Sequence, residues 1–280
     1  MRIVHSDEII GAVEALCIQA CRQLPEDVAC AMHCAADQEP FAPARMILSQ
    51  LVENAETAAQ NEMPICQDTG MAWVMVELGQ EVHLEGMLLK DAVDEGVRRG
   101  YTKGYLRKSV VADPLRRINT LDNTPALLHV EMVPGDAVTI TLAPKGFGSE
   151  NMSGLKMLTP SAGAEGVKDF VVDTVRRAGG NPCPPIVVGV GVGGSFDRVA
   201  LLAKKALMLP LDKPNPDPYY AEMEQELLSR INALGIGPQG FGGRTTALAV
   251  KILAYPTHIA GLPVAVNINC HVARHVQAVL

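Results

Sequence analysis

Three features are missing from this sequence, and each absence argues against a class of protein. No run of about 20 apolar residues is present, so no segment is expected to span a bilayer. Basic residues are outnumbered 24 to 31 by acidic ones, and the net charge of −7 argues against nucleic acid or an anionic membrane surface as the main partner. The N-terminal stretch carries charges where a signal peptide needs its apolar run, so we expect a soluble, cytoplasmic protein.

Aromatic residues are also scarce, at 4% of the 280 residues, whereas glycine (25) and proline (19) are common. This composition suggests many turns and close approaches between backbone segments. The hydrophobic share of 48% and the charged share of 20% differ from those of a disordered chain and supply ample material for a core.

The pattern of apolar residues predicts an α/β fold, with a mixed α+β fold as the alternative. We expect a single domain over residues 1–280, with a helical N-terminal layer (1–60), capped at Ser6, and a body of mixed sheet and helices (61–280). Two apolar runs, 127–133 and 137–142, flank a Pro-Gly-Asp turn and predict a β-hairpin. Further strands are expected at 71–78, 186–190, 247–255 and 264–269, and further helices at 84–99, 161–177 and 195–207 and before Gly235.

Seven cysteines without a secretion signal are expected to be reduced. The first four form two i, i+4 pairs on predicted helices, and cysteine is among the most buried residue types. We therefore predict core positions, not metal ligation, for Cys17, Cys21, Cys30 and Cys34.

The other three cysteines, Cys66, Cys183 and Cys270, stand at strand or loop ends among polar residues, glycine or proline. Their spacing matches no local ferredoxin or zinc pattern. Three thiolates that converge from distant loops would suit an iron–sulfur cluster with one iron open to substrate.

The run GVGVGG at 189–194 fits the G-x-G-x-x-G fingerprint of dinucleotide-binding proteins. Such a site also needs a second strand that ends in Asp or Glu about 20 residues further on. Asp212 stands near that distance but directly follows a predicted helix. We favour a tight strand-to-helix turn, and a non-catalytic dinucleotide-binding module is the alternative from another functional class.

Eight motifs, in order, resemble the class I (iron–sulfur) fumarate hydratase family, over the stretch from about residue 40 to the end. They are CQDTG (66–70), LRKSVVADP (106–114), NTLDNTPA (119–126), KGFGSENMS (145–153), NPCPP (181–185), GVGVGG (189–194), GIGPQGFGG (235–243) and NCHVARH (269–275). The match is to the N-terminal, cluster-binding half of that family. It implies the α subunit of a two-subunit hydro-lyase that interconverts fumarate and (S)-malate. The α subunit of L-tartrate dehydratase is the alternative, and mesaconate hydration is a further one.

The resemblance implies a [4Fe–4S] cluster held by Cys66, Cys183 and Cys270, in loops at strand ends, with one iron free of protein ligands. An iron of this kind is a Lewis acid that binds the substrate hydroxyl and a carboxylate. A positioned base then has to remove a weakly acidic C–H proton.

The same resemblance implies catalytic roles for Gln67, Asp68 and His258, with Asp68 in the proton-transfer network. All three are also expected to contact the substrate, and Arg107 resembles the arginine that binds a substrate carboxylate.

Two glycines, Gly146 and Gly148, are expected to offer backbone N–H groups to the anionic substrate. In the family this loop is a run of three glycines, which Phe147 interrupts here.

A C4 dicarboxylate brings two negative charges, for which the predicted residues offer only Arg107 and His258. The family's other cationic residues belong to a C-terminal half that nothing here resembles. The chain also stops ten residues after Cys270, on the apolar run VQAVL. We therefore expect a β subunit as partner in a hetero-oligomer and a lone chain that is catalytically incomplete.

Overall fold

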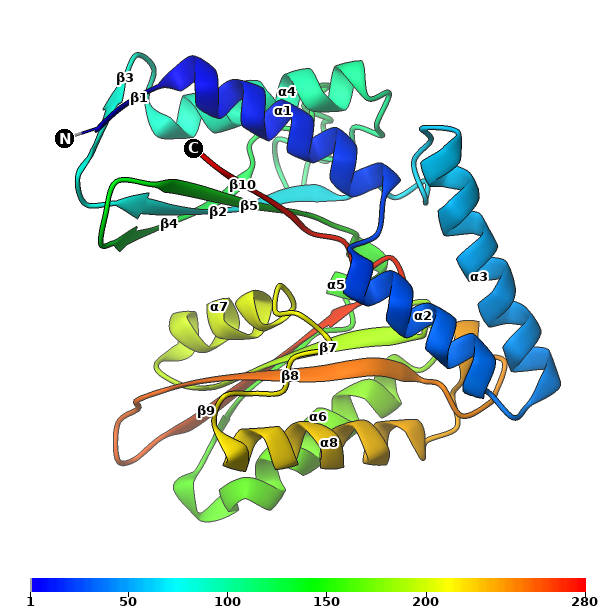
Figure 1. Ribbon diagram of the computed structural model, residues 1–280. Coiled ribbons are helices and arrows are strands. Elements are labelled where there is room, and N and C mark those ends of the chain that lie inside the picture. Colours follow the sequence, from blue (N-terminus) through cyan, green and yellow to red (C-terminus); the bar gives the residue numbers. More distant parts are fainter. Residues whose placement is uncertain (1) are drawn as a thin grey trace. The chain divides into compact units, whose positions relative to one another are not determined.

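The computed structural model describes residues 2–280 and has an α/β fold, as predicted (Figure 1). The chain forms two compact units. Unit 1 contains the residues up to Pro25, Asn54–Phe147 and Arg274–Leu280, and unit 2 contains Glu26–Glu53 and Gly148–Ala273. Between residues 2 and 280, no helix is both long and apolar enough to cross a membrane.

Unit 1 consists of a four-stranded mixed sheet, with helices on one face, and a separate pair of short strands. Its elements are β1 (Arg2–His5), α1 (Ser6–Arg22), β2 (Met71–Gly79), β3 (Val82–Glu85), α4 (Leu89–Lys103), β4 (Leu127–Val133), β5 (Val138–Lys145) and β10 (Val276–Val279). The strand order in the sheet is β10-β5-β2-β4, and β1 pairs with β3. Alternate residues of β2 and β5 face α1 and α4 and form the core of the unit.

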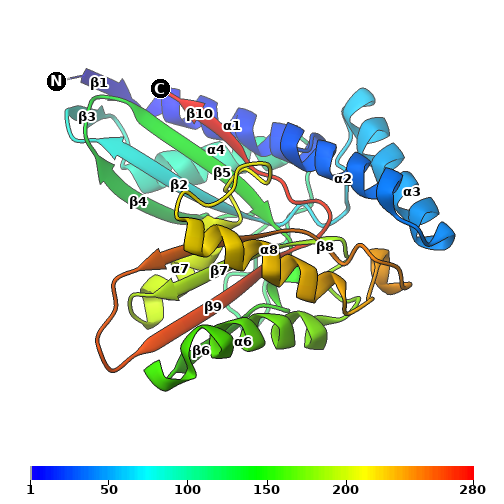
Figure 2. The same cartoon turned by 60° about the horizontal axis from the view of Figure 1, so that its bottom comes forward.

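Unit 2 is a second four-stranded sheet, with the order β6-β9-β7-β8 and helices on both faces (Figure 2). Its elements are α2 (Glu26–Gln38), β6 (Gly154–Leu158), η1 (Pro160–Ala162), α6 (Gly163–Ala178), β7 (Ile186–Gly193), α7 (Phe196–Ala206), α8 (Pro218–Asn232), η2 (Pro238–Gly240), β8 (Ala247–Tyr255) and β9 (Leu262–Asn269). The helices α6 and α8 pack on one face and α7 on the other. Two helices cross the boundaries of the units, α3 (Ala42–Gln60) and the short α5 (Phe147–Glu150).

Most of the predicted elements are confirmed, including three helices within residues 6–60 and strands at 71–79 and 247–255. Two predictions at helix starts are inaccurate. The cap of α1 is His5, whose side chain accepts the Asp7 N–H, whereas the Ser6 hydroxyl accepts the Met87 N–H at 3.1 Å. The predicted helix at 84–99 overlaps β3, and α4 begins only at Leu89.

The predicted hairpin between 127–133 and 137–142 is wrong in its pairing. Both runs are strands, but β2 lies between them, parallel to β4 and antiparallel to β5. Five consecutive residues of β2, 72–76, are buried. Such a strand needs hydrogen-bonding partners along both of its edges, because its backbone has no access to water.

Only half of the prediction for the early cysteines is confirmed. Cys17 and Cys21 are fully buried in α1, as predicted. Cys30 and Cys34 in α2 are exposed, and their predicted core positions are wrong. The helix α2 buries only a narrow stripe, at positions 28, 32 and 36, and residues two positions away point to the opposite side.

The glycines of GVGVGG allow a helix to pack directly on a strand. Gly189 and Gly191 lie inside β7, and a Cβ atom on either would stand 2.3 Å from a backbone carbonyl oxygen of α7. The turn that follows uses Gly193 and Gly194, both with positive φ. The motif is explained by packing and turn geometry, which removes the basis for the dinucleotide-binding alternative.

We expect Gly191→Ala to lower the free energy of unfolding, since overpacking of this kind typically costs about 1–3 kcal/mol. Gly11→Ala is the matched control, because a Cβ atom there meets no atom within 4 Å. In a helix interior, replacement of glycine by alanine raises the free energy of unfolding by about 0.5–1 kcal/mol. Chemical unfolding monitored by circular dichroism measures both changes. Equal stability of the two variants would contradict the packing argument.

Candidate active site

The backbone of residues 66–70, which leads into β2, is held by side chains at three successive carbonyl groups. The carbonyls of residues 68, 69 and 70 accept hydrogen bonds, in this order, from Arg274, Tyr101 and Asn123. All three donor residues are at most 4% exposed. The segment is therefore fixed from the interior of unit 1.

The carboxylate of Asp68 is oriented by two backbone N–H groups. Its Oδ1 atom accepts the N–H of Gly70 at 3.0 Å, and its Oδ2 atom accepts the N–H of Phe147 at 3.1 Å. A Cβ atom on Gly146 would stand 3.0 Å from Oδ2, so a larger residue at this position would press on the Asp68 carboxylate and displace it by a few tenths of an ångström. Phe147 contributes its backbone here, and the interrupted glycine run still reaches Asp68.

Arg107 lies in the long connection between α4 and β4, which is anchored to the same segment. The hydroxyl of Thr69 donates to the Arg107 carbonyl at 3.1 Å. Asn123, further along this connection, accepts the N–H of Ser109 at 2.7 Å with its side-chain oxygen. These bonds place Arg107 beside residues 66–70.

Four of the predicted residues, Gln67, Asp68, Arg107 and Gly146, thus lie together in unit 1. The side chains of Gln67 and Arg107 are exposed, and Asp68 is partly buried. An exposed guanidinium can bind a carboxylate through two parallel hydrogen bonds. The segment that carries Arg107 is bound to the segment that carries the oriented Asp68 carboxylate, and these two residue types together suit the binding of an organic acid and the transfer of its proton.

In unit 2, the structure brings Cys183 and Cys270 to the same end of the sheet. Asn269, the last residue of β9, pairs with Val187 near the start of β7. The next residue along the chain from Cys270, His271, donates its backbone N–H to the Cys183 carbonyl at 3.2 Å.

His271 is a residue that the predicted site left out. Its Nδ1 atom lies 3.1 Å from the Cys183 carbonyl and 3.3 Å from Nε2 of Gln239. The Gln239 side chain also donates to the Pro184 carbonyl at 2.7 Å. The sequence signal for His271 was its position directly after Cys270.

His258 lies away from these groups. It is exposed in the connection between β8 and β9, and its Nδ1 atom accepts the Ala260 N–H at 3.2 Å. The eight residues of β9 separate this connection from Cys270, a length of roughly 26 Å. The structure does not bring His258 to Cys183 and Cys270, and its role stays a prediction.

Gly148 belongs to the short helix α5, which is tied to the interior of unit 2. Glu150, the last residue of α5, accepts hydrogen bonds from Lys204 on both carboxylate oxygens and from Asn267 at 2.9 Å. Burial lowers the pKa of Lys204, and the Glu150 charge opposes this shift. A Cβ atom on Gly148 would meet no atom within 4 Å, so the space above this turn is open.

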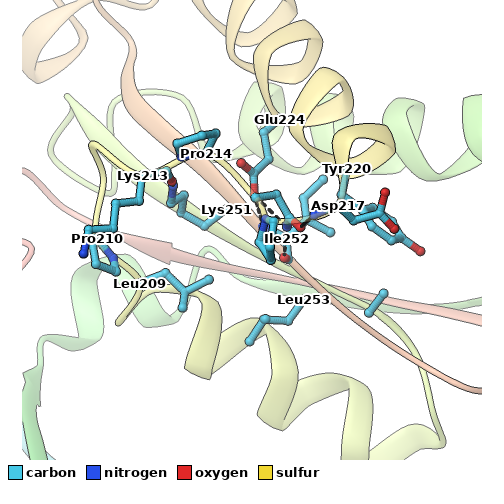
Figure 3. Close-up of a pocket in the computed structure, with 13 residues that line it drawn as sticks. Leu209, Pro210, Lys213, Pro214, Asp217, Tyr220, Glu224, Lys251, Ile252 and Leu253 are labelled. Carbon is cyan, nitrogen blue, oxygen red and sulfur yellow. Dashed lines mark hydrogen bonds between the residues drawn. The ribbon is translucent and has the colours of Figure 1, made fainter.

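A separate cavity of about 560 Å³ lies in unit 2, beside the free edge of β8 (Figure 3). None of the predicted site residues lines it. The side chain of Asn215 donates to the Ile252 carbonyl, and Glu224 accepts the Ile252 N–H, each at 2.8 Å. These two side chains occupy backbone groups that a further strand would otherwise use.

Comparison with known proteins places the chain in a family. The family model described as fumarate hydratase (Fumerase) matches residues 10–279. The chain belongs to the fumarate hydratase family. It is 41% identical over 273 residues to a Methanocaldococcus jannaschii protein that is named, provisionally, L(+)-tartrate dehydratase subunit alpha, and the match covers 95% of each chain. It is 33% identical over 259 residues to the L(+)-tartrate dehydratase subunit alpha of Escherichia coli strain UTI89, covering 90% of this chain and 84% of that relative.

The cysteines that the fumarate hydratase resemblance predicts as ligands are divided between the units. Cys66 belongs to unit 1, and Cys183 and Cys270 belong to unit 2. Within either unit, the described residues contain no group of three or more His, Cys, Asp or Glu side chains that could hold a metal ion. None of the seven cysteines forms a disulfide, and these three are partly or fully exposed.

Alkylation of the metal-free chain should distinguish these thiols from those of the core. Burial raises the pKa of Cys21 to about 11 and that of Cys17 well above its usual range. At pH 8 roughly a thousandth of such a thiol is the reactive thiolate. With iodoacetamide and peptide mass spectrometry, we expect Cys66, Cys183 and Cys270 to react long before Cys17 and Cys21, with the exposed Cys30 as internal reference. Modification of Cys21 at the rate of Cys30 in the folded chain would contradict this.

Proposed function

We propose that this chain is the α subunit of a [4Fe–4S]-dependent hydro-lyase that interconverts fumarate and (S)-malate. The observation that carries the proposal is the fixed segment Cys66–Gly70, in which a partly exposed cysteine is followed by an oriented carboxylate. Membership of the fumarate hydratase family supports it, as do the names of the relatives, which are subunits of a dehydratase.

We assign the cluster to Cys66, Cys183 and Cys270. The chemistry of these donors fits, because three reduced thiols at loop ends remain accessible while the thiols of Cys17 and Cys21 are enclosed in a core. When bound, the cluster supplies a Lewis-acidic iron to the substrate hydroxyl and carboxylate.

The chain's own residues bind the substrate and handle its proton. In this proposal the Arg107 guanidinium binds a substrate carboxylate, and the Gln67 amide and the Gly146 backbone contact the substrate. Asp68 takes part in proton transfer, with a carboxylate already oriented by the N–H groups of Gly70 and Phe147. The roles of Gly148 and His258 rest on the resemblance alone.

The two units act together as one α-subunit domain in this proposal, and the site is completed by a β subunit. The names of the relatives as alpha subunits support such a partner. In unit 1, Arg107 is the one cation among the predicted substrate contacts, and a dicarboxylate needs more positive charge than that. The apolar C-terminus has a role within unit 1, since β10 pairs with β5, but Val279 on this edge strand remains 65% exposed.

The choice of diacid is testable by one assay. We expect the complex with the β subunit, prepared without oxygen, to hydrate fumarate and dehydrate (S)-malate, and we expect the lone reconstituted chain to be inactive. L(+)-Tartrate is the second candidate substrate, because the relatives described above carry that name. Turnover of tartrate in preference to malate would replace the first assignment by the second. Turnover by the pure lone chain comparable to that of the complex would refute the need for a partner.

Single replacements by serine test the cluster ligands. We expect Cys66→Ser, Cys183→Ser and Cys270→Ser each to abolish the visible absorbance of the cluster and the activity, because each removes one thiolate from the proposed set. Cys30→Ser is the matched control, an exposed cysteine outside that set. The ligand set is wrong if a variant at position 66, 183 or 270 keeps a full complement of iron and sulfide.

A further inference from the structure

Arg274 is a buried cation whose hydrogen-bonding capacity is mostly unused. It lies in unit 1, between β9 and β10, and the residue as a whole is 4% exposed. The Nη2 atom donates to the Asp68 carbonyl, whereas Nε and Nη1 are buried and have no hydrogen-bond partner in the part of the chain that the structure describes. The described residues provide no carboxylate that forms an ion pair with it.

Such a side chain works against the stability of the fold. A buried polar N–H group without an acceptor loses its hydration and gains nothing in return. Replacement of a buried charge by an apolar side chain of similar volume is often neutral or stabilising. The presence of Arg274 therefore calls for an explanation other than stability.

The position of Arg274 beside the Asp68 main chain supplies this explanation. The carbonyls of residues 69 and 70 each accept hydrogen bonds from two side chains, which come from Cys21, Tyr101 and Asn123. The Asp68 carbonyl has a single donor among the described residues, and that donor is Arg274.

The charge of the Arg274 guanidinium also acts on Cys21 and Tyr101, two of the side chains that donate to this backbone. Burial raises the pKa of Cys21 to about 11, and the Arg274 charge opposes that shift. The same charge opposes the rise in the pKa of Tyr101 that burial causes. Arg22 also opposes the shift of the Cys21 pKa, and Arg274 differs from it by the hydrogen bond that it donates to the Asp68 carbonyl, within the 68–70 backbone.

We propose that Arg274 is a positioning residue, which holds the Asp68 main chain so that the Asp68 carboxylate keeps its orientation, and that it does so at the expense of stability. The activity part of this inference rests on the proposed hydro-lyase function. The structural part does not, because the hydrogen bonds from Gly70 and Phe147 to the Asp68 carboxylate report on its position directly.

The test compares Arg274→Met with Arg22→Met in the full chain. Arg22 is a matched control, because it is a largely buried arginine of the same unit whose Nε has no partner among residues 2–280 and which forms an ion pair with Glu62. We expect Arg274→Met to unfold at the same temperature as the wild type or higher. Its amides in peptides spanning 66–71 and 145–149 should exchange with deuterium about tenfold faster, while Arg22→Met leaves both peptides unchanged.

In the complex with the β subunit, we expect Arg274→Met to lower kcat about 100-fold and to leave KM within about threefold, as misplacement of a reacting group by about 1 Å can do. Arg274→Lys, which keeps the charge and one donor, should recover part of the exchange protection and of kcat. Unchanged exchange in Arg274→Met would overturn the positioning role, and a lower unfolding temperature would overturn the claim that Arg274 acts at the expense of stability. A wild-type complex that turns over none of the diacids would refute the proposed function instead, and the exchange result would still decide the role of Arg274.

Discussion

The main chain of residues 68–70 depends on hydrogen bonds from side chains that belong to separate parts of unit 1. Cys21 comes from α1, Tyr101 from α4, Asn123 from the connection before β4, and Arg274 from the segment before β10. Tyr101 is also part of the apolar core that α1, α4 and the sheet share. The packing of α1 and α4 on the sheet therefore determines where Asp68 and its neighbours lie. A change in that packing would displace residues of the candidate site.

Close helix packing in both units is made possible by glycine. In unit 1, a Cβ atom on Gly100 of α4 would stand 2.7 Å from the Cys17 Cβ atom of α1. In unit 2, Gly189 and Gly191 let α7 approach β7 in the same way. The scarcity of aromatic residues is consistent with this construction, since cores formed by short distances between backbones leave little room for large rings.

Local patterns in the sequence predict single elements well and their partners poorly. The strand β8 is found at its exact bounds because a run of apolar residues identifies a buried strand by itself. The pairing of β4 and β5 was wrong because β2, some fifty residues earlier in the chain than β4, inserts between them. At the candidate site, Gln67 and Asp68 follow from their adjacency to Cys66. Arg107 could be placed only by resemblance, because its position depends on the bonds of Thr69 and Asn123. Arg274 was missed for the same reason, since its contact joins residues about 200 positions apart in the chain. His271 had a local signal, its position after Cys270, but its contact with the Cys183 carbonyl joins residues about 90 positions apart.

The side chains of Asn215 and Glu224, which bind the backbone of Ile252, have a consequence for assembly. An open strand edge is a template on which another chain can add a strand. In the middle of β8, the backbone N–H and C=O groups of Ile252 are already bound by the side chains of Glu224 and Asn215. Recruitment of a foreign strand to the sheet of unit 2 is therefore disfavoured along β8, one of the two edge strands of that sheet.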